Sequence, residues 1–174
     1  MSQATNPVQL LQDYLHSSAD VAPEKVALVC KQSRVTYAEL NARSNALANT
    51  LVNSGVQRGD RVVIFSDNSV ETVVAFWATL KASAVASIVN PLTKADKLSY
   101  LLNDCRPTAL IADQHLYGVF ATPAKDSPHL KLVIVSGEII NERLSTLPNP
   151  QRWDAAIAAG DPNEAPERRC IDID

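Results

Sequence analysis

The sequence has 174 residues, enough to bury a substantial hydrophobic core, and its 46% hydrophobic and 20% charged residues are typical of one globular domain. Its net charge of −3 and its dispersed lysines and arginines exclude the basic surface that nucleic acid binding requires. No apolar run has the length of a transmembrane segment and the first residues do not resemble a signal peptide, so we expect a cytoplasmic protein whose three widely spaced cysteines are reduced thiols.

The first 55 residues predict two helices with a hairpin between them. The expected elements are a helix over residues 7–17, strands over 26–30 and 34–36, and a helix that begins at Tyr37. The second helix has the clearest start in the chain, because Thr36 and Glu39 have the spacing of a capping box. Gly55 supplies a left-handed stop at its other end.

Strands and helices then alternate along the chain. The expected strands are residues 61–65, 84–89, 108–112 and 131–135, with helices over 69–82 and from Thr93 to just before Pro107. Corresponding strand positions recur every 23 residues, at Val62, Val85, Thr108 and Lys131, which suits successive right-handed βαβ units. Continuous apolar strands indicate a parallel sheet covered on both faces, so we expect an α/β fold.

The last part of the chain gives a weaker signal. Residues 138–174 contain four prolines, and we expect an irregular segment with one short helix over residues 151–159. The final Ile171-Asp172-Ile173-Asp174 alternates like the start of a strand. The predicted division is therefore an α/β subdomain over residues 1–137 and an irregular segment over 138–174.

No catalytic or metal-binding arrangement is visible in these residues. The turn Ser66-Asp67-Asn68-Ser69 follows the first main strand without a glycine, so helix capping is favoured over phosphate binding. His16, His115 and His129 lie far apart, which favours surface histidines over metal ligands.

Three further groups of residues are expected to have structural rather than catalytic roles. Cys105, Phe76 and Trp77 lie among apolar helix positions and are expected to pack in the core. Asp67 and Asp113 follow strands, but their order does not match a phosphoacceptor domain.

A resemblance to a known family indicates a function, which composition and residue spacing do not. The stretches VTYAEL (35–40), GVQRGDRVVIFSDNSVETVVAFWATLKASAVASIVNP (55–91) and KLSYLLNDCRPTALIAD (97–113) together resemble the amino-terminal portion of the adenylate-forming superfamily. That superfamily contains acyl-CoA and aryl-CoA synthetases, luciferases and the adenylation domains of peptide synthetases. The resemblance implies that residues 80–91 form a helix leading into a central strand that ends at Pro91.

The sequence departs from the family pattern at two places. Ser83 stands where the family usually has glycine, and Ser87-Ile88 replaces a commoner valine-proline pair. Asn90 before Pro91 resembles acyl-CoA and fatty-acid ligases more than peptide-synthetase modules, which usually have aspartate there.

The resemblance implies an AMP-forming acid–thiol ligase as the parent protein. In the family, a carboxylate attacks the α-phosphorus of ATP with the help of Mg²⁺, and the thiol of CoA or of an acyl carrier protein then displaces AMP. The family's phosphate loop and its catalytic residues lie downstream of this sequence, so we expect an inactive first subdomain with no catalytic, cofactor or metal residue of its own. Loss of the downstream subdomains is expected to leave apolar surface that forms a homodimer.

Two questions stay open at this stage. If any residues approach a ligand, the strand-end loop Asn90, Pro91, Leu92 and Thr93 is the first choice, although Thr93 as a helix cap and Pro91 as a strand end are the favoured roles. The alternatives to the ligase are a peptide-synthetase fragment, a non-catalytic binding or oligomerisation module, and a free-standing nucleotide-binding protein.

Overall fold

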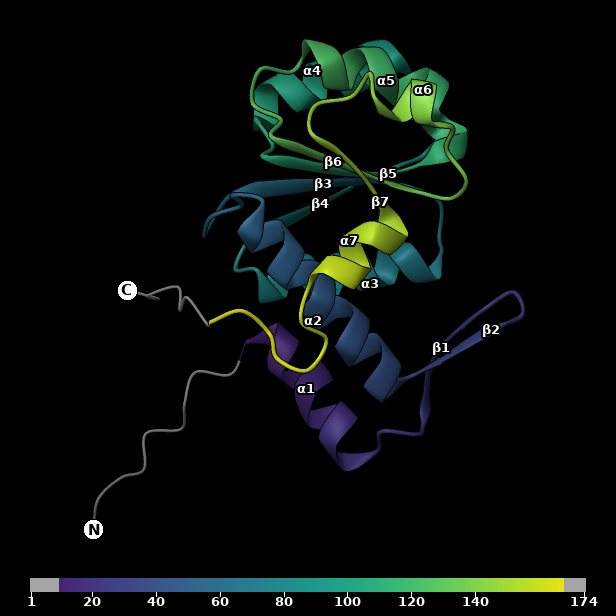
Figure 1. Cartoon of the computed structure of the whole chain (residues 1–174), viewed down its shortest axis with the longest axis vertical. Helices are drawn as coiled ribbons and strands as arrows, with labels where there is room; N and C mark the ends of the chain where they lie inside the picture. Colours follow the sequence, from purple (N-terminus) through teal and green to yellow (C-terminus); the bar gives the residue numbers. More distant parts are fainter. Residues whose placement is uncertain (1–9, 168–174) are drawn as a thin grey trace.

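The computed structural model describes residues 10–167, which form a parallel sheet between two layers of helices, with a hairpin to one side (Figure 1). The helices are α1 (Leu11–Val21), α2 (Tyr37–Asn53), α3 (Val70–Lys81), α4 (Ala95–Cys105), α5 (Tyr117–Asp126), α6 (Asn141–Leu144) and α7 (Trp153–Ala159), with a 3-10 turn at Gln114–Leu116. The strands are β1 (Val26–Cys30), β2 (Ser33–Thr36), β3 (Arg61–Phe65), β4 (Val85–Val89), β5 (Ala109–Asp113), β6 (Leu132–Ser136) and β7 (Pro150–Arg152). None of the helices within residues 10–167 has the length and apolar character of a membrane span.

The five-stranded sheet has the order β4-β3-β5-β6-β7, and all of its pairs are parallel. Alternate residues of its central strands enter two separate cores. In β3, Val62 and Ile64 pack in the core beneath α2 and α3, whereas Val63 and Phe65 pack in the core with α4 and α5. Helices therefore cover both faces, as Figure 1 shows, and the predicted α/β class is confirmed.

The start of α2 forms as its local sequence predicts. The Thr36 N–H donates to Glu39 Oε2 at 2.9 Å, and the Glu39 N–H donates to Thr36 Oγ1 at 3.2 Å. The two residues thus satisfy two backbone donors reciprocally, and α2 begins at Tyr37. The predicted left-handed stop is confirmed too, because Gly55 has a φ of +93°.

Two predictions about individual elements are wrong. The predicted strand over residues 84–89 forms as Val85–Val89, but within residues 10–167 it lies at the edge of the sheet rather than at its buried centre, and Val85 and Ile88 are 49% and 59% exposed. Strand order depends on contacts between distant segments, which the local pattern does not encode. The first helix is also displaced, because α1 continues to Val21 rather than ending near residue 17.

The segment after Gly137 is more ordered than its prolines predict, at least as far as residue 167. Residues 150–152 form β7, which pairs with β6, and Ala156 of α7 is fully buried in the core under the sheet. Pro150 is tolerated because β7 is an edge strand, paired on one side only. The predicted short helix is confirmed as Trp153–Ala159, whereas the alternating residues 171–174 lie outside the described residues. The division of the chain at residue 137 stays a prediction.

Candidate functional site

The carboxyl edge of the sheet has a topological switch point, which is where open α/β folds bind ligands. From β3 the chain proceeds to β4 on one side of it, and β5 then returns to its other side. The loops that follow β3 and β5 therefore leave in opposite directions at a topological switch point.

Three titratable side chains meet at this switch point. His115 Nδ1 lies 2.8 Å from Asp113 Oδ1, and His115 Nε2 lies 3.2 Å from Asp67 Oδ2. The three side chains are partly exposed, at 45% for His115, 27% for Asp113 and 61% for Asp67. The histidine therefore links the loop after β3 to the loop after β5 at a solvent-accessible position, where exposed charge pairs contribute little to stability.

The local sequence pattern predicts a separate role for each of these residues and does not predict that they meet. His115 was expected at the surface, and the structure agrees, but its contacts with Asp67 and Asp113 depend on the adjacency of β3 and β5. The signal available in the sequence is that Asp113 ends one buried strand and Asp67 lies two residues after another. Parallel strands that become neighbours place such residues side by side.

The predicted pocket-edge loop lies at the end of β4. Three of its four residues, Asn90, Leu92 and Thr93, line a shallow hollow of about 390 Å³, and Pro91 does not. Asn90 Oδ1 accepts a hydrogen bond from the Leu92 N–H at 2.9 Å, which fixes the turn. The expectation that Thr93 caps the next helix is wrong, because the cap position of α4 is Lys94, whose side chain makes no capping bond.

The strand-end turn at residues 66–69 performs the capping role predicted for it. Ser69 Oγ accepts a hydrogen bond from the Thr72 N–H at 3.2 Å, and Thr72 Oγ1 donates to the Asp67 carbonyl at 2.6 Å. Within residues 10–167, no group of three or more His, Cys, Asp or Glu side chains is arranged to hold a metal ion.

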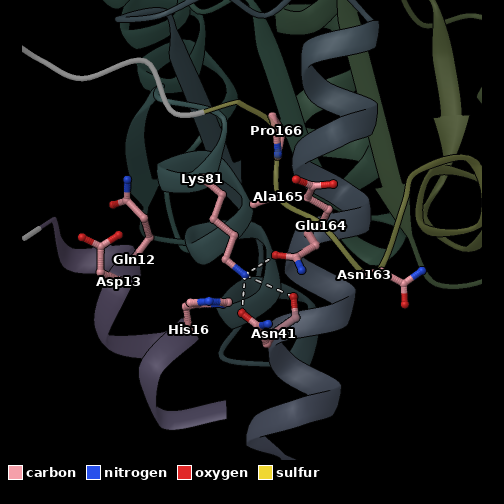
Figure 2. A pocket seen from close by; sticks show the side chains of 10 residues that line it. Gln12, Asp13, His16, Asn41, Lys81, Asn163, Glu164, Ala165 and Pro166 are labelled. Atoms are coloured by element: carbon pink, nitrogen blue, oxygen red, sulfur yellow. Dashed lines mark hydrogen bonds between the residues drawn. The ribbon is translucent and has the colours of Figure 1, made fainter. Parts of the chain in front are cut away.

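A second cavity, of about 270 Å³, lies between α1, α2, the end of α3 and residues 163–166 (Figure 2). Lys81 enters it from α3 and is only 6% exposed. Its Nζ, with three N–H donors at most, lies within hydrogen-bond distance of four oxygens: Asn45 Oδ1 at 2.6 Å, Asn41 Oδ1 at 2.7 Å, Ser44 Oγ at 2.7 Å and the Asn41 carbonyl at 3.1 Å. All four acceptors are uncharged.

Burial determines the acid–base behaviour of this lysine. Desolvation lowers the pKa of Lys81 from its ordinary 10.5 to about 7. Asp13, His16 and Glu164 line the same cavity from α1 and from the segment after α7 (Figure 2). An amine with a pKa near neutrality beside a cavity is unusual, and groups with shifted pKa values are concentrated at functional sites.

Sequence reasoning missed the role of Lys81. The residue entered only as part of the Leu-Lys-Ala match to the family. The available signal was its position on α3, because Val74 and Ala78 lie on the buried face and Lys81 is the next residue at helical spacing on that face. A lysine there must find buried acceptors, which α2 supplies.

The sequence matches the family described as AMP-binding enzyme over residues 15–169. The chain belongs to this family. It is 32% identical over 162 residues to a 3-oxocholest-4-en-26-oate–CoA ligase of Rhodococcus rhodochrous, an alignment that covers 93% of this chain and 29% of that ligase. It is also 36% identical over 104 residues to tyrocidine synthase 3 of Brevibacillus parabrevis, covering 60% of this chain and 2% of the synthase.

The fold agrees with that membership. The crystal structure of an anthranilate CoA ligase in complex with anthranoyl-AMP superposes with a TM-score of 0.83 at 25% identity, covering 95% of this chain and 31% of the ligase. This member of the AMP-binding family spans less than a third of the length of each of these two CoA ligases. The expected relationship to adenylate-forming enzymes is confirmed.

Proposed function

We propose that this chain is the first subdomain of an AMP-forming acyl-CoA synthetase, which activates a carboxylic or fatty acid as its adenylate and transfers it to a thiol. The observation that carries the proposal is the family match over residues 15–169, together with CoA ligases among its relatives. The small share of those relatives that the chain spans supports a larger parent protein.

In this proposal the chain supplies framework and one pocket wall. The parallel sheet would form a rigid support, and the loop Asn90–Thr93 with the neighbouring switch point would form the edge of a ligand pocket. Further parts of the parent would bind ATP, Mg²⁺ and CoA or an acyl carrier protein. The parent would act in the cytoplasm, where ATP and CoA are available.

A peptide-synthetase adenylation domain is the second candidate. The identity to tyrocidine synthase 3 favours it, whereas the asparagine at position 90 favours a free-standing CoA ligase. The two candidates differ in the acid that they activate, since peptide synthetases take amino acids. A panel of acids therefore separates them.

The decisive experiment uses the continuous reading frame that contains residues 1–174. Its product is assayed for carboxylate-dependent exchange between pyrophosphate and ATP with fatty, aryl and amino acids. We expect exchange with fatty or aryl acids, followed by thioester formation with CoA. Exchange with amino acids alone would support the peptide synthetase, and a reading frame that stops at Asp174 would support a non-catalytic module.

Residues 1–174 by themselves provide a complementary test. We expect no saturable heat of binding when millimolar ATP is titrated into the purified chain with Mg²⁺. The reason is that the described strand-end turns use their polar groups as helix caps. Clear saturable binding would support a free-standing nucleotide-binding protein and contradict the assignment of the ATP site to other parts of the parent.

A further inference from the structure

The segment that follows α7 is fastened to α2 by side-chain amides. We name residues 161–166 the exit strap. Asn49 Nδ2 donates to the carbonyls of Glu164 at 2.7 Å and Asp161 at 3.2 Å, and Asn45 Nδ2 donates to the carbonyl of Pro162 at 3.1 Å. All three acceptors belong to the backbone, so the attachment does not depend on the side chains of the strap.

A close backbone approach brings the strap to this position. A Cβ atom on Gly160, just before the strap, would overlap the carbonyl group of Ala46 on α2. Thr50 Oγ1 also donates to the carbonyl of Ala156 at 2.6 Å, which holds the end of α7 against the same helix. Side chains on one face of α2 therefore hold the chain from Ala156 to Glu164 by hydrogen bonds.

Lys81 determines which way the Asn45 amide points. Its Nζ donates to Asn45 Oδ1 at 2.6 Å, which leaves the Asn45 Nδ2 group directed at the Pro162 carbonyl. A reversed amide would place its N–H₂ group against the lysine and its oxygen against a carbonyl, with both contacts repulsive. Asn45 is only 3% exposed, so water does not readily compensate for that reversal.

The contacts of Lys81 with Asn41 and Ser44 show that it also joins α3 to α2. That role alone would not require Asn45, because neither Asn41 nor Ser44 is hydrogen-bonded to the strap. The contact through Asn45 adds a connection from α3 to the strap, and Figure 2 shows the strap residues beside the same cavity.

We propose that Lys81 is a positioning residue that acts through Asn45 to hold the exit strap on α2, and so sets the direction in which the chain leaves this subdomain. The inference concerns the described residues and stands whether or not the parent is a ligase. If the proposed function holds, the strap precedes the parts of the parent that would bind ATP, and Lys81 helps to place them.

Cleavage by glutamyl endopeptidase at the Glu164–Ala165 bond measures opening of the strap in residues 1–174. Asn45→Asp keeps an acceptor for Lys81 but removes the donor to Pro162, and Lys81→Met keeps Asn45 but removes what orients it. We expect each variant to be cleaved about five- to tenfold faster, the effect of losing one or two hydrogen bonds. Asn103→Asp, whose amide bonds only within α4, is the matched control and should be cleaved at the original rate.

A double-mutant cycle tests whether Lys81 acts through Asn45. Lys81→Met should increase cleavage in the original chain but produce little further increase when Asn45 is already alanine. Independent, multiplicative effects would overturn the proposal, as would an Asn45→Asp chain that is cleaved at the original rate. Thermal unfolding of each variant separates opening of the strap from unfolding of the whole chain. Faster cleavage without a matching fall in the unfolding temperature comes from the strap, whereas cleavage that rises in proportion to global destabilisation would contradict the proposal. If Lys81→Met does not fold, Asn45→Asp still tests the proposal, because cleavage of that chain at the original rate would overturn it.

Discussion

Lys81→Met should remove a specific pH dependence from the stability of this chain. Burial lowers the pKa of Lys81 to about 7, whereas the unfolded chain keeps this proton up to its ordinary pKa of 10.5. Between these values the unfolded state binds more protons than the folded state, so the free energy of unfolding rises with pH. Below pH 7 both states are protonated, and the contribution of Lys81 no longer changes with pH.

The size of the effect follows from the two pKa values. The free energy of unfolding should rise by up to about 1.4 kcal/mol per pH unit within this window, and by at most about 5 kcal/mol across it. Both figures are upper limits, because the four oxygens within hydrogen-bond distance of Nζ favour the charged amine. Methionine has a similar length and no charge, so the variant should lack this slope.

Urea unfolding followed by tryptophan fluorescence, at several values from pH 6 to pH 9.5, measures the difference between the original chain and Lys81→Met. The difference matters because Cys105 acts in the opposite direction: burial raises the pKa of its thiol, so its contribution falls at high pH in both proteins. Lys97→Met, which changes an exposed lysine of α4, is the control. Parallel pH profiles for the original chain and Lys81→Met would refute the reasoning.

Three further variants test particular features of the fold. Ser83 has a left-handed φ of +58°, so Ser83→Gly should raise the free energy of unfolding by about 0.5–1 kcal/mol after the entropy of the unfolded chain is deducted, and an unchanged urea midpoint would contradict this. Gly160→Ala should destabilise the chain by about 2 kcal/mol because of the overlap with Ala46, which a lower thermal midpoint would show and an unchanged one would exclude. We expect residues 1–174 to dimerise through the exposed edge strand β4, and Ile88→Lys to prevent this. Sedimentation velocity measures the oligomeric state of the original chain and of Ile88→Lys. A monomeric original chain would rule out the expected dimer.

The sequence predicted the elements whose signals are local. The capping box of Thr36 and Glu39 placed the start of α2 at Tyr37, and the apolar run after Arg61 predicted the strand Arg61–Phe65 with both of its ends. These features depend on groups within a few residues of one another, or on the burial of one continuous segment. Resemblance to a family, carried by short stretches in the right order, supplied the functional class.

The functional arrangements were less predictable because they join distant segments. Asp67 and His115 are 48 positions apart and meet only because β3 and β5 are neighbours. Pro150 suggested an irregular segment and instead lies in an edge strand, where its missing N–H costs no sheet hydrogen bond on the open side.

The sequence by itself determined that alternating apolar strands and capped helices must form a covered parallel sheet, since periodicity and capping are properties of neighbouring residues. Tertiary structure alone decided the strand order, which leaves β4 at the edge, and the surroundings of Lys81. An amine that is buried 36 positions away from the amide that accepts its hydrogen bond owes its pKa to packing between helices. Packing of this kind results from the whole fold, so no local pattern of residues specifies it.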